Sequence, residues 1–134
     1  SPIAEALLHQ QTAGRVEVAS AGSQPKPRLH PMAVRVLREE YDIDIGEQRP
    51  RSLETLTGRR FDQVITLCDK VREVCPEFPH HPRRAHWSIA DPATVGRTGN
   101  PGYQAFRDTA AAINVRVRHL LSVLAQPALT EVRP

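Results

Sequence analysis

A short apolar run, QVITL at residues 63–67, constrains the fold of this chain more than any other sequence feature. Three of its members are β-branched, and such a run is typical of a parallel strand buried on both faces. Parallel strands are joined by long crossovers, usually helices. Helical patterns do flank the run on both sides, so the sequence predicts an α/β domain.

Those helical patterns have recognisable ends. A first helix begins at Ser1, has Pro2 at its first helical position and ends before Gly14. A second begins at Pro31, and a short helix follows Ser52. The last helix is expected over 101–125. Its apolar face should comprise Phe106, Ala110, Ile113, Val117, Leu120 and Leu124.

Two further strands are expected, at 16–19 and at 86–89. The order α-β-α-α-β-β-α predicts a three-layer domain with a mostly parallel sheet. A doubly wound unit normally opens with a strand that feeds the first helix, whereas here a helix begins at residue 1. We therefore expect that the sequence lacks the domain's first strand.

Composition narrows the functional classes. The 134 residues are the size of one domain, and no run of 18 apolar residues predicts a membrane span. The net charge of +3 comes from scattered Lys and Arg with few aromatic residues, so we expect no nucleic-acid surface. Without a visible secretory signal, and with only two cysteines, a cytoplasmic protein in a reducing compartment is expected.

The cysteines are Cys68, directly after the apolar run, and Cys75. A disulfide needs Cα atoms about 4.4–6.8 Å apart, so residues 69–74 must coil or loop to join them. Three interpretations stay open on spacing alone. The thiols are inert and buried, they bind zinc with some of three nearby histidines, or they do redox chemistry. The histidines are His80, His81 and His86.

Chemistry in such sheets collects beyond the carboxyl ends of the strands. Ser1 at a helix N-terminus, Cys68 and Asp91 are all expected there. Asp91 precedes Pro92, and is either a turn residue or a carboxyl that delivers a proton to a leaving oxygen.

Together these residues resemble the thioredoxin-coupled arsenate reductases, which share the low-molecular-weight tyrosine-phosphatase fold. The matching segments are VITLC before Cys75-Pro76, then HW at 86–87, DPA at 91–93, SPIAE at 1–5 and SAG at 20–22. The resemblance covers nearly the whole chain. It is specific, because plain phosphatases of this fold lack the Cys-x6-Cys-Pro segment.

The resemblance implies a four-stranded sheet and a cysteine relay. A Cys in a Cys-x5-Arg loop ending just before Ser1 would attack arsenate, and Asp91 would protonate the departing oxygen. Cys68 would then attack that cysteine's sulfur and release arsenite. Cys75 would attack Cys68, leaving a Cys68–Cys75 disulfide for thioredoxin or a similar thiol donor.

The same resemblance predicts residues that support the site. The chain also departs from the family's pattern in two ways. Glu5, Ser20, Arg51, His86 and Trp87 would support the site. The chain lacks Cys-x5-Arg, so as given it would be inactive, a single domain over 1–134 without its first strand and nucleophile loop. Some relatives bind potassium through Glu5-like and Ser20-like oxygens and an Asp aligned near Arg51. A guanidinium there disfavours a cation, so we expect no metal and no bound cofactor.

Two alternatives belong to other classes. A low-molecular-weight tyrosine phosphatase would use Asp91 but leaves Cys68 and Cys75 without a role. A non-catalytic regulatory domain would keep the fold and lose the loop. We expect a monomer in each case.

Overall fold

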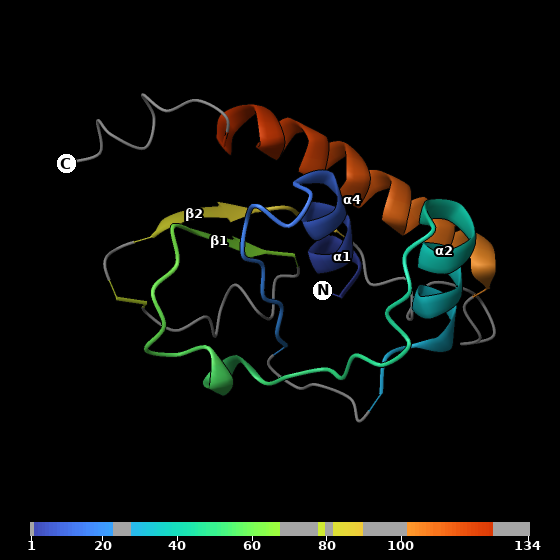
Figure 1. Cartoon of the computed structure of the whole chain (residues 1–134), viewed down its shortest axis with the longest axis horizontal. Helices are drawn as coiled ribbons and strands as arrows, with labels where there is room; N and C mark the ends of the chain where they lie inside the picture. The colour runs from blue at the N-terminus through green and yellow to red at the C-terminus, as the bar shows by residue number, and fades with distance from the viewer. Residues whose placement is uncertain (1, 23–27, 68–77, 80–81, 90–101, 125–134) are drawn as a thin grey trace.

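The structure, a computed structural model, describes residues 2–22, 28–67, 78–79, 82–89 and 102–124. These residues form α-helices, a short 3-10 helix and a small sheet (Figure 1). The elements are α1 (Pro2–Gln11), α2 (Pro31–Tyr41), the 3-10 helix η1 (Leu53–Thr55), β1 (Gln63–Thr66), β2 (Arg83–His86) and α4 (Tyr103–Leu124). The α/β class is confirmed, and each of the four predicted helical segments is present within a few residues of its expected ends.

The hydrophobic core forms along one face of the long helix α4. It runs past both α1 and α2, and α1 lies between the sheet and α2 (Figure 1). Five of the six residues predicted for its apolar face are buried: Phe106, Ala110, Ile113, Val117 and Leu120. They pack with buried residues of the other two helices, chiefly Ile3, Leu7, Val36 and Leu37. Leu124, the sixth, is half-buried at the last residue of the helix.

The N-terminus of α2 is fixed from its own side and from α4. The His30 Nδ1 accepts the Met32 N–H at 3.1 Å and caps the helix, and Pro31 follows at its first position. The same imidazole stacks on Phe106, with ring centroids 4.4 Å apart. One side chain therefore both starts α2 and ties it to α4.

β1 and β2 form a parallel pair with Gln63 opposite Arg83 and Thr66 opposite His86. The prediction of β1 is confirmed. The bounds predicted for the last strand, 86–89, are wrong, because the strand occupies Arg83–His86. Its sequence RRAH has no apolar alternation that could have signalled it. The segment forms a strand despite this polar composition because its backbone pairs with β1.

The predicted strand at 16–19 is also wrong. A strand needs a hydrogen-bonded neighbour, and none of the described residues pairs with this stretch. Parallel pairing starts only at Gly22, which bridges to Ser52. In the described part of the chain the sheet has two strands, so the missing first strand stays a prediction.

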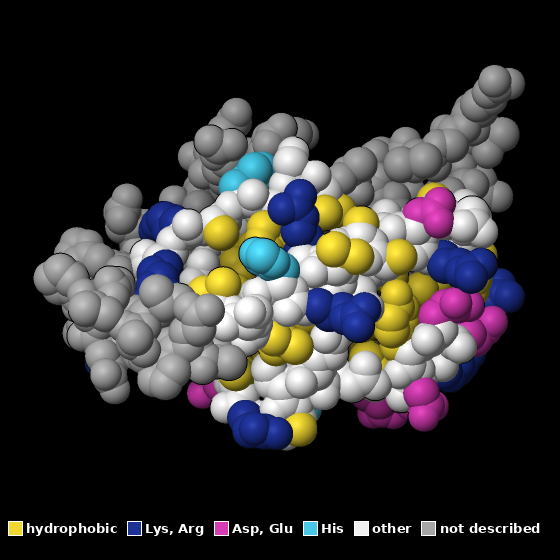
Figure 2. All heavy atoms as spheres, turned by 90° about the horizontal axis from the view of Figure 1, so that it is seen from above, with side chains coloured by type: hydrophobic (Ala, Val, Ile, Leu, Met, Phe, Trp, Pro, Cys, Tyr) yellow, Lys and Arg dark blue, Asp and Glu magenta, His cyan; other side chains and the backbone are white. Residues whose placement is uncertain are grey.

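The surface mixes charge types. Figure 2 shows Arg side chains spread singly over one face, with acidic side chains gathered among them at the α2 end. Arg35 pairs with Glu39 there, and Arg107 of α4 pairs with Glu40. None of the described helices combines the length and the apolar character that a bilayer crossing would need.

Replacing Ile113 with Ala tests the α4 core. Ile113 is 1% exposed, so its truncation leaves a cavity and should lower the free energy of unfolding by about 2–5 kcal/mol. Val115, two residues along and 65% exposed, is the matched control. Val115→Ala should change the free energy of unfolding by less than about 0.5 kcal/mol. Urea unfolding measures both. Equal effects would contradict the packing described above.

Candidate functional site

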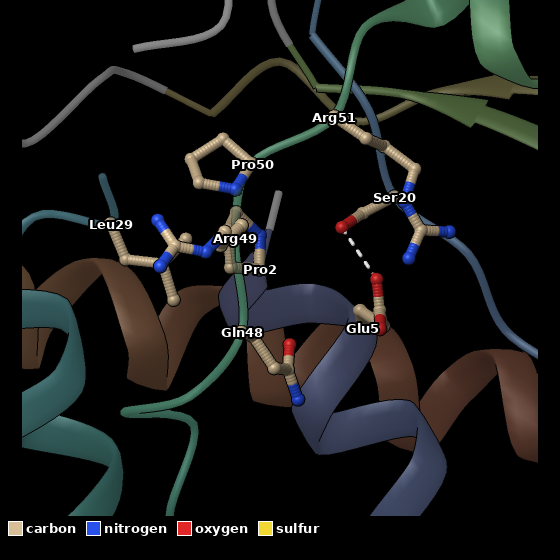
Figure 3. A pocket seen from close by; sticks show the side chains of 8 residues that line it. All are labelled: Pro2, Glu5, Ser20, Leu29, Gln48, Arg49, Pro50 and Arg51. Atoms are coloured by element: carbon tan, nitrogen blue, oxygen red, sulfur yellow. Dashed lines mark hydrogen bonds between the residues drawn. The ribbon is translucent and has the colours of Figure 1, made fainter. Parts of the chain in front are cut away.

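The N-terminus of α1 opens onto a pocket of about 310 Å³ (Figure 3). Four parts of the chain build it: the first turn of α1, Ser20, Leu29 just before α2, and residues 48–51 before η1. Its lining residues are Pro2, Glu5, Ser20, Leu29, Gln48, Arg49, Pro50 and Arg51. Helix N-termini present unpaired N–H groups and a positive dipole end, so a pocket at this place favours anionic groups.

A short hydrogen bond joins two of the predicted supporting residues. The Ser20 hydroxyl donates to the Glu5 Oε1 at 2.6 Å. Glu5 lies in the first turn of α1, where a carboxylate is favourable because of the helix dipole. The bond therefore fastens the segment after α1 to the start of that helix.

Arg51 lies on the same side of the pocket. Figure 3 shows its side chain extending to Ser20. Its backbone is held by the neighbouring segment, because the Gly22 N–H donates to the Arg51 carbonyl at 3.0 Å. The Leu53 N–H in turn donates to the Gly22 carbonyl, also at 3.0 Å. These bonds bring Glu5, Ser20 and Arg51 together, as sequence reasoning grouped them.

Sequence reasoning missed Gln48 and Arg49. Both line the pocket, and Figure 3 shows Arg49 on the Leu29 side, away from Arg51. The two guanidiniums give the pocket two positive charges against one carboxylate, that of Glu5. The signal available in the sequence was the close spacing of Arg49 and Arg51, which is common on solvated surfaces and therefore unspecific.

His86 and Trp87 lie elsewhere, at the carboxyl end of the strand pair. The His86 Nδ1 is 2.7 Å from the Thr66 Oγ1, and the Trp87 N–H donates to the Thr66 carbonyl at 2.8 Å. The Trp87 side chain is half-buried and packs against the helical core. These two residues therefore connect the end of the sheet to the rest of the domain.

The residues predicted to do the chemistry lie outside the described residues. They are Ser1, Cys68, Cys75 and Asp91, and the histidines His80 and His81 of the zinc alternative lie outside too. Within the described ranges no three His, Cys, Asp or Glu side chains are grouped as metal ligands. The structure fixes the flanks of the predicted relay: Leu67, just before Cys68, and Phe78, beyond Cys75.

Comparison with known proteins identifies the family. The sequence profile of the low molecular weight phosphotyrosine protein phosphatases matches residues 1–129. The chain belongs to this family. An arsenate reductase of Bacillus licheniformis is 32% identical over 118 residues, covering 88% of this chain and 84% of that protein. An arsenate reductase of Bacillus anthracis is 35% identical over 108 residues, covering 81% and 77%.

Solved structures agree with the family. An arsenate reductase in its oxidized state superposes with a TM-score of 0.77 at 27% identity, over 93% of this chain and 89% of that one. A thioredoxin-dependent arsenate reductase of Corynebacterium glutamicum gives 0.70 at 30% identity, over 94% and 57%. A low molecular weight tyrosine phosphatase from T. tengcongensis, at 22% identity, shares the fold with a TM-score of 0.72. The predicted low-molecular-weight phosphatase fold is confirmed.

A double-mutant cycle tests the pocket's hydrogen bond. Glu5→Gln, Ser20→Ala and the double variant should give a coupling free energy of about 1 kcal/mol in urea unfolding, because the bond is charge-assisted. Thr57 serves as the control, since its hydroxyl bonds instead to the Glu54 carbonyl. A cycle of Glu5→Gln with Thr57→Ala should show no coupling. Zero coupling in both cycles would mean that the charge of Glu5 adds nothing to the Glu5–Ser20 bond.

Proposed function

We propose that this protein reduces arsenate to arsenite through a relay of cysteines that ends in a Cys68–Cys75 disulfide. One observation carries the proposal. Two cysteines with six residues between them come after β1, the first of them two residues beyond Thr66, in a chain whose relatives are named arsenate reductases. Active sites of parallel sheets collect at that end of the strands. If the protein were a tyrosine phosphatase, Cys68 and Cys75 would have no role in its reaction.

The relay begins with a cysteine thiolate that attacks the arsenic atom. One arsenic–oxygen bond breaks as the sulfur–arsenic bond forms, and Asp91 gives its proton to the departing oxygen, which leaves as water. The Cys68 thiolate then attacks the sulfur of that adduct. The sulfur–arsenic pair of electrons passes to arsenic, which leaves as arsenite. The two sulfurs have been oxidised and the arsenic reduced by two electrons.

The next steps regenerate the first cysteine. The Cys75 thiolate attacks the Cys68 sulfur and displaces the first thiolate, leaving a Cys68–Cys75 disulfide. A thioredoxin-type dithiol reduces this disulfide and becomes oxidised itself. The thioredoxin-dependent structural relative from Corynebacterium glutamicum supports this class of donor. A reducing compartment such as the cytoplasm fits the scheme, since the relay must be reset after every turnover.

We further propose that residues encoded ahead of Ser1 supply the attacking cysteine in a Cys-x5-Arg loop, together with a strand. No Cys-x5-Arg occurs within residues 1–134. The N-terminus of α1 opens on the pocket, where the amides of such a loop and of the helix would meet the oxyanion. In the described part of the chain β1 is paired on one edge and 16–19 is unpaired, so both would accept a strand between them.

Arg51 would serve this site as a fixed cation. It lies beside the Glu5–Ser20 pair, in a pocket that already holds a second guanidinium. Another cation placed there would be repelled by two like charges, so the donor set fits a bound metal ion poorly. We therefore propose that the protein works without a metal, and that Arg51 itself supplies the positive charge at this place.

Product analysis separates this function from its alternatives. The chain extended by the encoded upstream residues should release arsenite from arsenate when thioredoxin, its reductase and NADPH are supplied. Efficient p-nitrophenyl phosphate hydrolysis without arsenite release would support the phosphatase instead. Neither activity would support a non-catalytic domain.

Changing Cys75 to Ser tests the last transfer. The first two cysteines could still release one arsenite, but their disulfide would not be passed on. We expect about one arsenite per enzyme, followed by arrest, in a thioredoxin-coupled assay of the extended chain. Sustained turnover of Cys75→Ser would contradict the proposed role of Cys75.

Changing Asp91 to Asn tests the proton donor. Asn keeps the shape of the side chain and removes its acidic proton, so the rate of arsenate reduction should fall by roughly 10²–10⁴-fold. Single-turnover kinetics of the extended chain measure the step directly. Asp108, on the outer side of α4, provides the matched control Asp108→Asn, which should retain full rate. An unchanged rate for Asp91→Asn would leave Asp91 as a turn residue.

A further inference from the structure

A group of hydrogen bonds fixes the carboxyl end of β1 to His86, the last residue of β2, and to the residues that follow it. The Thr66 Oγ1 and the His86 Nδ1 lie 2.7 Å apart. The Thr66 carbonyl accepts the Trp87 N–H at 2.8 Å, and the Leu67 carbonyl accepts the Ile89 N–H at 3.0 Å. We call these three bonds the strand-end clamp. Cys68 is the next residue in the sequence after Leu67.

The clamp marks the point at which the backbone leaves the strand. Along a regular strand successive carbonyls point to opposite edges, so a neighbour on one side bonds alternate residues. Thr66 and Leu67 are consecutive, yet both carbonyls bond to the same segment, 87–89. The backbone therefore rotates between them.

The Thr66–His86 pair adds a side-chain hydrogen bond at the residue just before this rotation. The two residues are opposite one another in the parallel register, and Thr66 is only 7% exposed. A hydroxyl left unpaired at such a position would be costly, which favours keeping the bond. The hydroxyl both donates and accepts, so the bond forms with either imidazole tautomer. The clamp is thus independent of which ring nitrogen carries the proton.

We propose that Thr66 and His86 are positioning residues for the Cys68 thiol. By fixing the backbone up to Leu67, they reduce the freedom that the Cys68 end must lose when it joins Cys75, and so favour the disulfide. This inference rests on the proposed function, because the relay gives Cys68 its role.

The test measures the equilibrium between the Cys68–Cys75 disulfide and glutathione in the chain extended by the encoded upstream residues, with the proposed loop cysteine changed to Ser so that Cys68 and Cys75 are left to pair. Thr66→Val removes the hydroxyl at nearly constant volume. It should lower the effective concentration of one thiol toward the other by roughly three- to tenfold, the value of one hydrogen bond. Thr66→Ser restores the hydroxyl and should stay within about twofold of the unsubstituted chain. Mass spectrometry after acid quenching gives the oxidised fraction.

Two further comparisons guard against a general loss of structure. His86→Asn keeps a polar group near the position of Nδ1 and should preserve the equilibrium, whereas His86→Leu should lower it like Thr66→Val. His86 has a further interaction of its own, so the Thr66 variants carry the quantitative comparison. Thr55→Val is the control, because its hydroxyl bonds to the Ser52 carbonyl on the exposed surface near η1.

Hydrogen exchange at the Trp87 and Ile89 amides separates the clamp from the relay. Exchange should be faster in Thr66→Val and unchanged in Thr66→Ser. An equal or higher effective concentration in Thr66→Val, or no rescue by Thr66→Ser, overturns the positioning role. If no chain forms the disulfide, the relay fails and this proposal fails with it. Unchanged amide exchange in Thr66→Val overturns the clamp alone and leaves the relay standing.

Discussion

Burial of the apolar face of α4 is the interaction on which the other features of this domain depend. Phe106, Ala110, Ile113 and Val117 are nearly inaccessible and contact residues of both α1 and α2. Each fully buried aliphatic or aromatic side chain contributes about 1.5–3 kcal/mol. Because α1 is packed on α4, its N-terminus is held at the pocket. The position of the proposed oxyanion site is therefore a consequence of helix packing.

The pocket adds a second level of organisation, made of polar contacts. Backbone bonds between Gly22 and the Arg51–Leu53 stretch tie together two segments about 30 residues apart in sequence. That link brings Arg51 to the side of Ser20, and the Ser20–Glu5 bond connects both to α1. The pocket thus receives its carboxylate from α1, but both of its guanidiniums come from a segment that has no helical or strand structure of its own. Such irregular segments commonly carry function on a rigid scaffold.

The carboxyl end of the strand pair is organised independently of that pocket. Its polar contacts run between β1 and the residues following β2, and the half-buried Trp87 joins it to the helical core. The proposed chemistry needs the two places for different purposes. The α1 N-terminus would hold an oxyanion, whereas the strand end would present a thiol. A shared core that supports both places gives them a fixed relation.

The sequence by itself determined the helices and β1. Periodic apolar residues, Pro at helix starts and a β-branched run are local signals, and α2, α4 and β1 follow them closely. Through the family resemblance it also grouped Glu5, Ser20 and Arg51, which the structure places at one pocket, and the family itself is shown by a match over residues 1–129.

Tertiary structure alone decided the rest. β2 is the arginine-rich Arg83–His86, because pairing with β1 supplies what its composition does not signal. The alternating residues 16–19 are no strand, because strand formation depends on a neighbour and not on local pattern. Arg49 and the Thr66–His86 bond were equally invisible in the sequence, since each depends on which distant segment lies alongside. Local propensity selects an element, but only long-range contacts select its partner.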